Sequence, residues 1–329
     1  MVRVKYRLVR PAAPTTAQVV ADPDQALVVA HRAGPLLVLG GPGTGKTTTL
    51  VESVAARVGE GTPADRVLVL TFGRRMAAAL RTRVESRTGA AGGAISPPAV
   101  RTFHAFAFGL LRQAAAQRGQ PAPRLLTGPE QDLVIRELLD GDRSGWPAGL
   151  SAALGTRAFA QQLRDLMLRT AERGLDAAGL AKYGAALGRE DWVAAANFLR
   201  RYHQVLALRD LSGRAGEAYD TAELIRAATS LLDADPGLLA TVRAGLSTVY
   251  VDEYADTDPA QRDLLARIAG GGAHLVAFAD PDSSTYAFRG ADPGGVTAFP
   301  ERFRRIDGQP APVLTLRRSH RVGAGPAAS

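Results

Sequence analysis

The residues whose types and spacing best suit chemistry form a glycine-rich octapeptide, Gly40-Gly41-Pro42-Gly43-Thr44-Gly45-Lys46-Thr47. An apolar run at 36–39 precedes it, and a helical pattern begins at Thr48. Glycines let successive backbone N–H groups turn toward phosphate oxygens, and the N-terminus of the following helix adds positive charge. In this pattern Lys46 reaches the β- and γ-phosphates of a nucleotide, and the Thr47 hydroxyl binds Mg²⁺. The sequence therefore predicts a P-loop, and the flanking elements disfavour the alternative of a chance glycine-rich turn.

An acidic pair supplies the second half of the predicted site. Asp252 and Glu253 directly follow 247–251, an apolar run that predicts a buried strand. In P-loop folds such carboxylates hold Mg²⁺ and position the attacking water. We predict that Asp252 belongs to the coordination shell of the metal and that Glu253 deprotonates the water. The alternative is a solvated acidic turn.

Composition limits the other kinds of site. The chain has 329 residues, no cysteine and a formal net charge of +8. Without cysteine there are no disulfides, thiolate metal sites or cysteine nucleophiles. The five histidines have no metal-ligand spacing, so Mg²⁺ is the one ion predicted. The basic balance suits a polyanionic partner such as nucleic acid, but an arginine-rich, GC-biased genome explains it equally well.

Hydropathy predicts no membrane segment, because no apolar run of about 18 residues occurs. Residues 1–10 are basic and alternate with the period of a strand, without the apolar core of a signal peptide. We therefore expect a cytoplasmic protein.

Strands and helices alternate over much of the chain, which predicts an α/β fold with a parallel sheet. Strands are expected at 36–39, 66–72, 100–103, 247–251, 274–279 and 313–316. Between about 118 and 214 only helices are predicted, with a capping box at Thr127 and Glu130 and two apolar stripes, at 159–170 and 192–206, expected to be core. The expected division is a strand and linker at 1–22, an ATP-binding domain at 23–117 and 216–329, and a helical insertion at 118–215.

Several motifs in order make the chain resemble the N-terminal part of a UvrD/Rep-type superfamily-one DNA helicase, and most closely the actinobacterial helicase–nuclease subunits of the AdnAB kind. The segments that carry the resemblance are Asp24-Gln25, the octapeptide, Leu70-Thr71-Phe72-Gly73-Arg74-Arg75-Met76-Ala77-Ala78, Thr102-Phe103-His104-Ala105-Phe106, Tyr219-Asp220-Thr221-Ala222-Glu223-Leu224, Val251-Asp252-Glu253-Tyr254-Ala255-Asp256-Thr257-Asp258-Pro259, the stretch 280–291, and Leu316-Arg317-Arg318-Ser319-His320-Arg321. The resemblance implies a RecA-like fold that binds ATP and Mg²⁺.

The resemblance also implies roles for single residues. Gln25 hydrogen-bonds the adenine, His320 stands where the family stacks a tyrosine on it, and Arg321 reaches the γ-phosphate. Thr48 joins the nucleotide-binding residues of the octapeptide. The implied DNA-binding residues are Phe72, Arg74, Thr102, Phe103, His104, Tyr286 and Phe288. For each phenylalanine the alternative is core packing.

The chain departs from the family at two glutamines, because Ala255 and Ser283 stand in their places. Our hypothesis is that ATP binding persists while hydrolysis and its coupling to DNA weaken. The chain also ends where a second RecA-like domain is expected, so we expect a fragment or half of a motor.

The expected function is the first motor domain of an ATP-dependent 3′–5′ DNA helicase acting on single-stranded and duplex DNA. A second helicase–nuclease subunit is a further expected partner. One alternative is a scaffold subunit that binds ATP and DNA but hydrolyses weakly. Another is an unrelated P-loop enzyme such as a small-molecule kinase.

Overall fold

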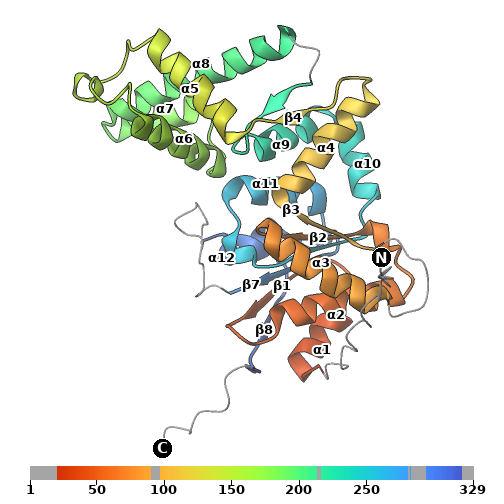
Figure 1. The fold of residues 1–329 in the computed structure, drawn as a ribbon. Helices are drawn as coiled ribbons and strands as arrows, with labels where there is room; N and C mark the ends of the chain where they lie inside the picture. Colours follow the sequence, from red (N-terminus) through yellow and green to blue (C-terminus); the bar gives the residue numbers. More distant parts are fainter. Residues whose placement is uncertain (1–20, 90–96, 213–215, 281, 283–293, 321–329) are drawn as a thin grey trace, which may run out of the picture.

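A six-stranded sheet organises the molecule, and every neighbouring pair in it is parallel (Figure 1). The computed structural model describes residues 21–89, 97–212, 216–280, 282 and 294–320, so the strand expected at 1–10 lies outside it. The strands, in their order across the sheet, are β3 (Ala99–Thr102), β2 (Val67–Thr71), β6 (Thr248–Val251), β7 (Leu275–Ala279), β1 (Pro35–Gly40) and β8 (Val313–Leu316). The predicted α/β class with a parallel sheet is confirmed.

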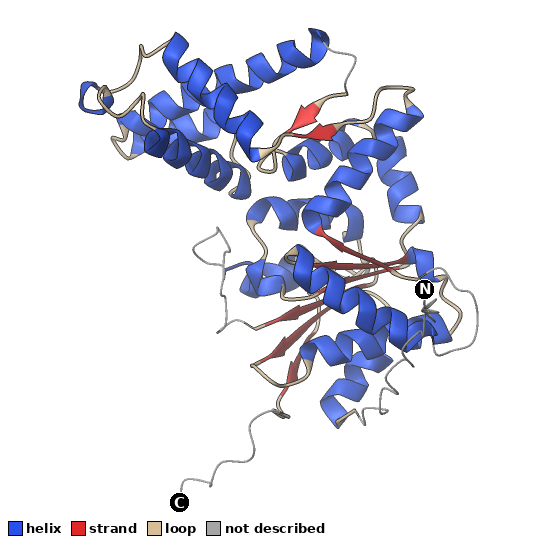
Figure 2. Ribbon diagram, in the orientation of Figure 1, coloured by secondary structure: helices blue, strands red, loops and turns tan. Residues whose placement is uncertain are grey.

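Successive residues of each central strand contribute to two different cores, which explains why these strands are continuous apolar runs. In β1, Leu36 and Val38 pack on one face of the sheet, whereas Leu37 packs on the other. The first face is covered by α1 (Pro23–Ala30), α2 (Lys46–Gly59) and α3 (Arg74–Gly89). The second is covered by α4 (Phe103–Gln117), α9 (Leu224–Ala234), α10 (Pro236–Ala244), α11 (Pro259–Ala269) and α12 (Gly294–Arg302). Helices therefore cover both faces (Figure 2).

The remaining helices lie away from the sheet and have a core of their own (Figure 1). They are α5 (Gly128–Gly141), α6 (Arg157–Glu172), α7 (Ala177–Ala186) and α8 (Glu190–Ser212). The capping box predicted at Thr127 and Glu130 begins α5. Both apolar stripes are confirmed as core: Leu163 belongs to the first, and Leu199 and Tyr202 to the second.

Short elements that the sequence did not predict complete the fold. A two-stranded parallel sheet joins β4 (Arg124–Leu125) to β5 (Ala218–Tyr219), so the chain on either side of the distal helices is paired. Single turns of 3₁₀-helix occur at η1 (Ala64–Arg66), η2 (Ala148–Leu150) and η3 (Tyr254–Asp256). The strand expected at 100–103 ends at Thr102, because that hydroxyl accepts a hydrogen bond from the N–H of Ala105 and begins α4 at Phe103.

Helix α1 was also not predicted, although its start signals are in the sequence. Asp22 accepts from the backbone N–H of Gln25, and the Gln25 side chain accepts from the N–H of Asp22, with Pro23 in the first turn. A capping box with proline at this position is typical of a helix start. None of the helices in the described part of the chain is long and apolar enough to cross a bilayer.

Candidate functional site

A cavity of about 890 Å³ opens at the carboxyl ends of the central strands, where ligands bind in open parallel sheets. Segments that follow β1, β2, β6 and β7 all contribute to its wall. It is lined by Gly41, Pro42, Gly43, Gly45, Lys46, Thr47, Thr48, Thr71, Phe72, Gly73, Arg74, Arg75, Met76, Arg83, Glu253, Asp256, Asp280 and His320. The fold thus brings the glycine-rich octapeptide and the acidic pair to one place.

The octapeptide has the backbone that a P-loop needs. Gly43 and Gly45 have φ values of 80° and 84°, which favour glycine, and α2 begins at the next residue, Lys46. The ammonium of Lys46 is buried, 2.8 Å from the carbonyl oxygen of Gly40 and 3.3 Å from a carboxylate oxygen of Asp280. A phosphate would replace these partners at the tip of the side chain.

Asp252 is suited to a cation. Its side chain is fully buried, with the Thr47 hydroxyl and the Glu253 N–H beside it, but neither carboxylate oxygen has a hydrogen-bond partner in good geometry among the described residues. Burial raises the pKa of this carboxyl to about 6, while the charges of Lys46 and Arg83 oppose the shift. An unpartnered buried carboxylate beside a P-loop threonine fits a magnesium ion. The described residues contain no cluster of three or more acidic or histidine ligands, so phosphate and water would complete the shell.

Glu253 lies beside Asp252 in a strained backbone conformation. Its φ of 53° is the one positive value among the described non-glycine residues. Such strain costs roughly 1–3 kcal/mol and persists where the surroundings impose it. Burial, followed by the charge of Asp252, raises the pKa of Glu253 to about 7. A carboxyl with this pKa can take a proton from water near neutral pH.

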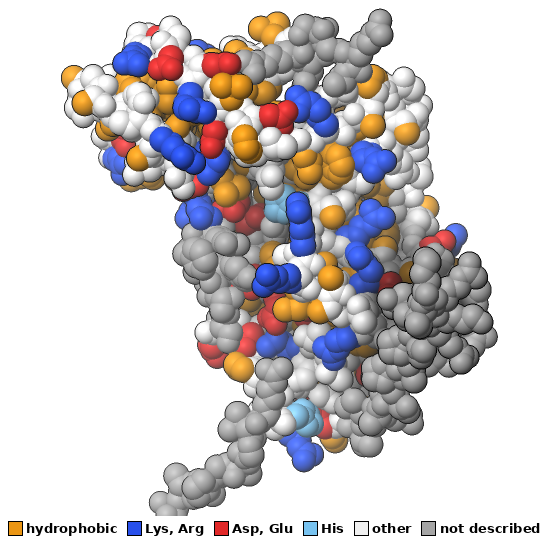
Figure 3. Space-filling view, in the orientation of Figure 1, with side chains coloured by type: hydrophobic (Ala, Val, Ile, Leu, Met, Phe, Trp, Pro, Cys, Tyr) orange, Lys and Arg blue, Asp and Glu red, His pale blue; other side chains and the backbone are white. Residues whose placement is uncertain are grey.

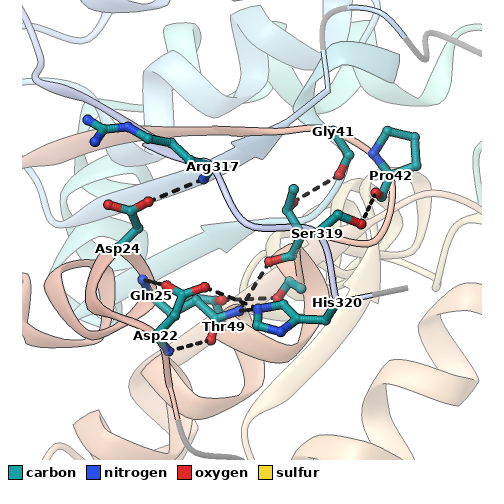
Figure 4. Close-up of polar contacts among 11 residues, drawn as sticks. Asp22, Asp24, Gln25, Gly41, Pro42, Thr49, Arg317, Ser319 and His320 are labelled. Atoms are coloured by element: carbon teal, nitrogen blue, oxygen red, sulfur yellow. Dashed lines mark hydrogen bonds and ion pairs between the residues drawn. The ribbon is translucent and has the colours of Figure 1, made fainter. Parts of the chain in front are cut away.

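A polar network closes the side of the cavity near α1 (Figure 4). The Gln25 amide donates to the carbonyl oxygen of Thr44 at 3.1 Å and lies 3.3 Å from His320 Nε2. His320 Nε2 is also 3.1 Å from a carboxylate oxygen of Asp22, and the His320 backbone N–H donates to the carbonyl oxygen of Gly43. Gln25 and His320, both predicted to contact the base, therefore meet at the P-loop.

Gly45 is required twice over in this arrangement, which gives a stability prediction. A Cβ at this position would lie 2.5 Å from Gln25 Nε2, and its left-handed backbone disfavours any side chain. We expect Gly45→Ala to lower the free energy of unfolding by about 1–2 kcal/mol or more. Denaturant unfolding measures this, with Gly41→Ala as control, since no atom lies within 4 Å of a Cβ there. Equal unfolding midpoints for the two variants would contradict the prediction.

The predicted DNA-binding residues are split between surface and core. Phe72 lines the cavity and packs 5.7 Å, centroid to centroid, from Phe103. Phe103 is only 1% exposed and belongs to the core, so here the structure favours packing over a stacking contact. Thr102 caps α4, and burial lowers the pKa of the neighbouring His104. Arg74, on α3, is exposed and lines the cavity.

Two further residues belong to the site although sequence analysis did not place them there. Arg83 lines the cavity and donates to the Thr48 hydroxyl at 3.0 Å. Asp280 pairs with Lys46, and the signal for it was available, because an acid directly after a buried strand is what identified Asp252. Basic side chains lie along the face formed by α3 and α4 (Figure 3).

Other predicted positions contribute nothing to the described site. Tyr286, Phe288 and Arg321 lie outside the described residues, as does Ser283. Ala255 is 3% exposed and packs in the core, so it presents no polar group to the cavity.

Comparison with known proteins agrees with this architecture. Residues 20–304 match the family model of the UvrD/REP helicase N-terminal domain. The chain is 29% identical over 294 residues to ATP-dependent DNA helicase UvrD1 of Mycobacterium tuberculosis, covering 86% of this chain and 36% of that protein. It is 29% identical over 315 residues to UvrD2 of the same species (91% and 41%), and 27% identical over 284 residues to PcrA of Staphylococcus epidermidis (85% and 36%).

The chain spans roughly two-fifths or less of the length of these relatives. The family match itself extends over most of the chain, from α1 through α12. It includes the P-loop, the acidic pair and the distal helices in one segment. The chain therefore belongs to the UvrD/REP helicase family, and it matches the N-terminal domain of that family.

Proposed function

We propose that this chain is the ATP-binding first motor domain of a 3′–5′ DNA helicase or translocase, in which ATP hydrolysis drives movement along single-stranded DNA. The observation that carries the proposal is the cavity shared by Lys46, Glu253 and the arginines of α3. One cavity then bears both a phosphate-binding loop and the edge of a basic surface. The names of the relatives, which are ATP-dependent DNA helicases, support the same function.

In this proposal the P-loop backbone from Gly40 to Thr48 cradles the phosphates. Lys46 exchanges Asp280 for the β- and γ-phosphates, and Gln25 and His320 hold the base. Thr47 and Asp252 would hold Mg²⁺, which neutralises charge on the phosphates when bound. Arg321, outside the described residues, is proposed to reach the γ-phosphate. The protein supplies mainly position and charge, since phosphoryl transfer needs little covalent chemistry from it.

Glu253 is the proposed general base, which predicts how hydrolysis depends on pH. The rate should rise with pH through about 7 and then level off, because only the ionised carboxylate can accept a proton from water. Steady-state phosphate release between pH 5.5 and 9, at saturating ATP, measures this. A rate that stays constant from pH 6 to 8 would exclude Glu253 as the base whose ionisation limits the reaction.

The DNA track is proposed to run over α3 and the start of α4. Arg74 and Arg75 would contact phosphates, with Phe72, Thr102, Phe103 and His104 beneath or beside the strand. Tyr286 and Phe288 remain proposed stacking residues outside the described part. Because Phe103 is buried, its contribution would be to support Phe72 rather than to contact a base.

Phosphate contacts make a salt prediction. For single-stranded DNA, log K falls with log salt concentration by about 0.7 per phosphate contact. Removing two contacts with Arg74→Gln and Arg75→Gln should therefore make this slope less steep by about 1.4. Fluorescence anisotropy with an oligonucleotide of mixed sequence measures the slope. The matched control is Arg136→Gln, because this exposed arginine lies on α5. An unchanged slope in the double variant would remove these arginines from the track.

The larger assembly is also a proposal. We propose that residues 23–117 and 216–329 form the ATP-binding domain and 118–215 an inserted helical subdomain, consistent with the separate core of α5–α8. The AdnAB-like resemblance suggests a second helicase–nuclease subunit as partner. Movement along DNA would require a second motor domain that opens and closes against this one.

The test is phosphate release from ATP by this chain, with and without single-stranded DNA, using Lys46→Met as the blank. DNA-stimulated turnover above the blank supports a motor. Binding of ATP and DNA without turnover fits both half of a motor and the alternative of a weakly hydrolysing scaffold subunit, which the apolar Ala255 favours, and turnover of the full-length protein separates the two. Absence of ATP binding at millimolar concentration would overturn both.

A further inference from the structure

The Gln25 side chain can take only one orientation. Its Oε1 lies 3.2 Å from the backbone N–H of Asp22, and its Nε2 lies 3.1 Å from the carbonyl oxygen of Thr44. If the amide were flipped, its NH₂ group would face the N–H of Asp22 and its oxygen would face the carbonyl oxygen of Thr44, so both hydrogen bonds would be lost. Oε1 is therefore occupied, and one N–H of Nε2 is occupied too. The second N–H of Nε2 is the one donor that remains for another partner, while Oε1 keeps a second lone pair.

His320 presents one nitrogen to two competing partners (Figure 4). His320 Nε2 lies 3.1 Å from Asp22 Oδ2, which can only accept, and 3.3 Å from Gln25 Nε2, which can only donate. A ring nitrogen either carries a proton and donates, or carries a lone pair and accepts. The two contacts therefore cannot both be hydrogen bonds at the same time.

The contact with Asp22 is the stronger of the two. The Asp22 carboxylate is 5% exposed, and a hydrogen bond to an ionised group is roughly twice as strong as one between neutral groups. Breaking it would leave Oδ2 buried without this partner, whereas Gln25 would lose only a neutral contact. The proton therefore resides on Nε2 of His320, and the second N–H of Gln25 has no acceptor in that ring nitrogen.

We propose that Asp22 is a positioning residue for nucleobase recognition: by holding the proton on His320 Nε2, it frees one Gln25 amide N–H to donate to a ring-nitrogen acceptor of a purine. This inference rests on the proposed nucleotide site and deepens it. His320 and Gly45, the glycine against which the Gln25 amide packs, both line the cavity that contains the P-loop, and Gln25 itself is 4% exposed and is reached through these two residues. The donor would favour purine nucleotides, whose N7 is an exposed acceptor that pyrimidines lack.

Asp22→Ser tests this role without removing the helix cap. Serine caps helices about as well as aspartate, so its hydroxyl can still accept from the N–H of Gln25. It lacks the second oxygen that reaches His320. In this variant Nε2 should lose its proton to Nδ1 and accept from Gln25, which occupies the freed donor.

The first measurement is the ¹⁵N chemical shifts of the His320 ring in the nucleotide-free 329-residue chain, with His320→Phe to identify the signals. We expect a protonated Nε2 in the unsubstituted chain and an unprotonated Nε2 in Asp22→Ser. The matched control is Asp24→Asn, because Asp24 accepts from the Arg317 N–H on the same two segments without contacting His320. An unprotonated Nε2 in the unsubstituted chain would overturn the proposal.

The second measurement compares the affinities for ATP and 7-deaza-ATP. The unsubstituted chain should bind ATP about threefold to tenfold more tightly, as expected for one neutral hydrogen bond. Asp22→Ser should bind the two nearly equally, and Asp24→Asn should keep the preference. If the unsubstituted chain binds both equally while Lys46→Met binds both at least about tenfold more weakly, the inference fails and the proposed function stands. If no variant binds ATP, the proposed function itself fails.

Discussion

Lys46→Met is expected to lower the affinity for ATP by roughly 10- to 100-fold, the effect of removing one hydrogen-bonded charge from a buried phosphate site. Methionine keeps the apolar stem and its packing, so the charge is the main loss. In the nucleotide-free chain the Lys46 ammonium is already held at the carbonyl oxygen of Gly40, so little ordering is needed when phosphate binds. Isothermal titration with ATP and Mg²⁺ measures the change.

A matched control separates this effect from a general change in charge. Lys182, on the surface of α7, carries the same ammonium far along the chain from the P-loop. Lys182→Met should bind ATP as the unsubstituted chain does. Because Lys46→Met leaves the buried carboxylate of Asp280 without its ion partner, both variants should be shown folded by denaturant unfolding at the assay temperature. Equal affinities for a folded Lys46→Met and a folded Lys182→Met would contradict the P-loop assignment.

How much of the site could be predicted depended on how local its signals are. The octapeptide is contiguous, and its glycines, lysine and threonine each have one dominant use after a strand and before a helix. Asp252 and Glu253 were predictable for a similar reason, because strand ends in a parallel sheet converge at one edge. Asp280 obeys the same rule, but nothing in the sequence indicated that Lys46 was its partner.

Contacts between segments far apart in the chain could not be predicted from the sequence. Asp22 and His320 are separated by 298 positions, and only the pairing of β1 with β8 brings the chain after β8 onto the P-loop. The sequence analysis explained His320 locally, as a variant of a stacking aromatic, and placed Asp22 in a linker. Their joint effect on Gln25 depends on which oxygen faces which ring nitrogen, which no spacing rule supplies.

The phenylalanines show a different limit. Phe72 and Phe103 belong to motifs associated with DNA, and periodicity cannot tell which ring faces solvent. In the fold Phe103 is the first residue of α4, and its ring points into the core, where it supports the more exposed Phe72. A motif residue can thus serve a surface through another side chain, and burial is the observation that distinguishes the two roles.

Glu253→Gln is expected to lower DNA-stimulated ATP hydrolysis by about 10²- to 10⁴-fold, the usual contribution of a general base. The amide has nearly the same shape but cannot accept a proton from water. The ATP affinity of Glu253→Gln should stay within about threefold of that of the unsubstituted chain. The uncharged amide repels the phosphates no more than the carboxylate does. Single-turnover phosphate release and equilibrium titration separate the two quantities. Glu85→Gln, at an exposed position of α3, is the control for the loss of one acidic charge.

The same substitution should make the folded chain more stable at alkaline pH, which distinguishes a catalytic residue from a structural one. The pKa of Glu253 is raised to about 7 in the fold, by burial and by Asp252. A carboxyl with a raised folded pKa costs stability as pH rises from its unfolded value through 7, because the charged form is disfavoured in the fold. Glutamine has no charge to bury, so Glu253→Gln should unfold at a higher denaturant concentration than the unsubstituted chain at pH 8, and this difference should shrink at pH 5. A variant that loses both turnover and stability at pH 8 would show that Glu253 holds the loop together rather than acting on water.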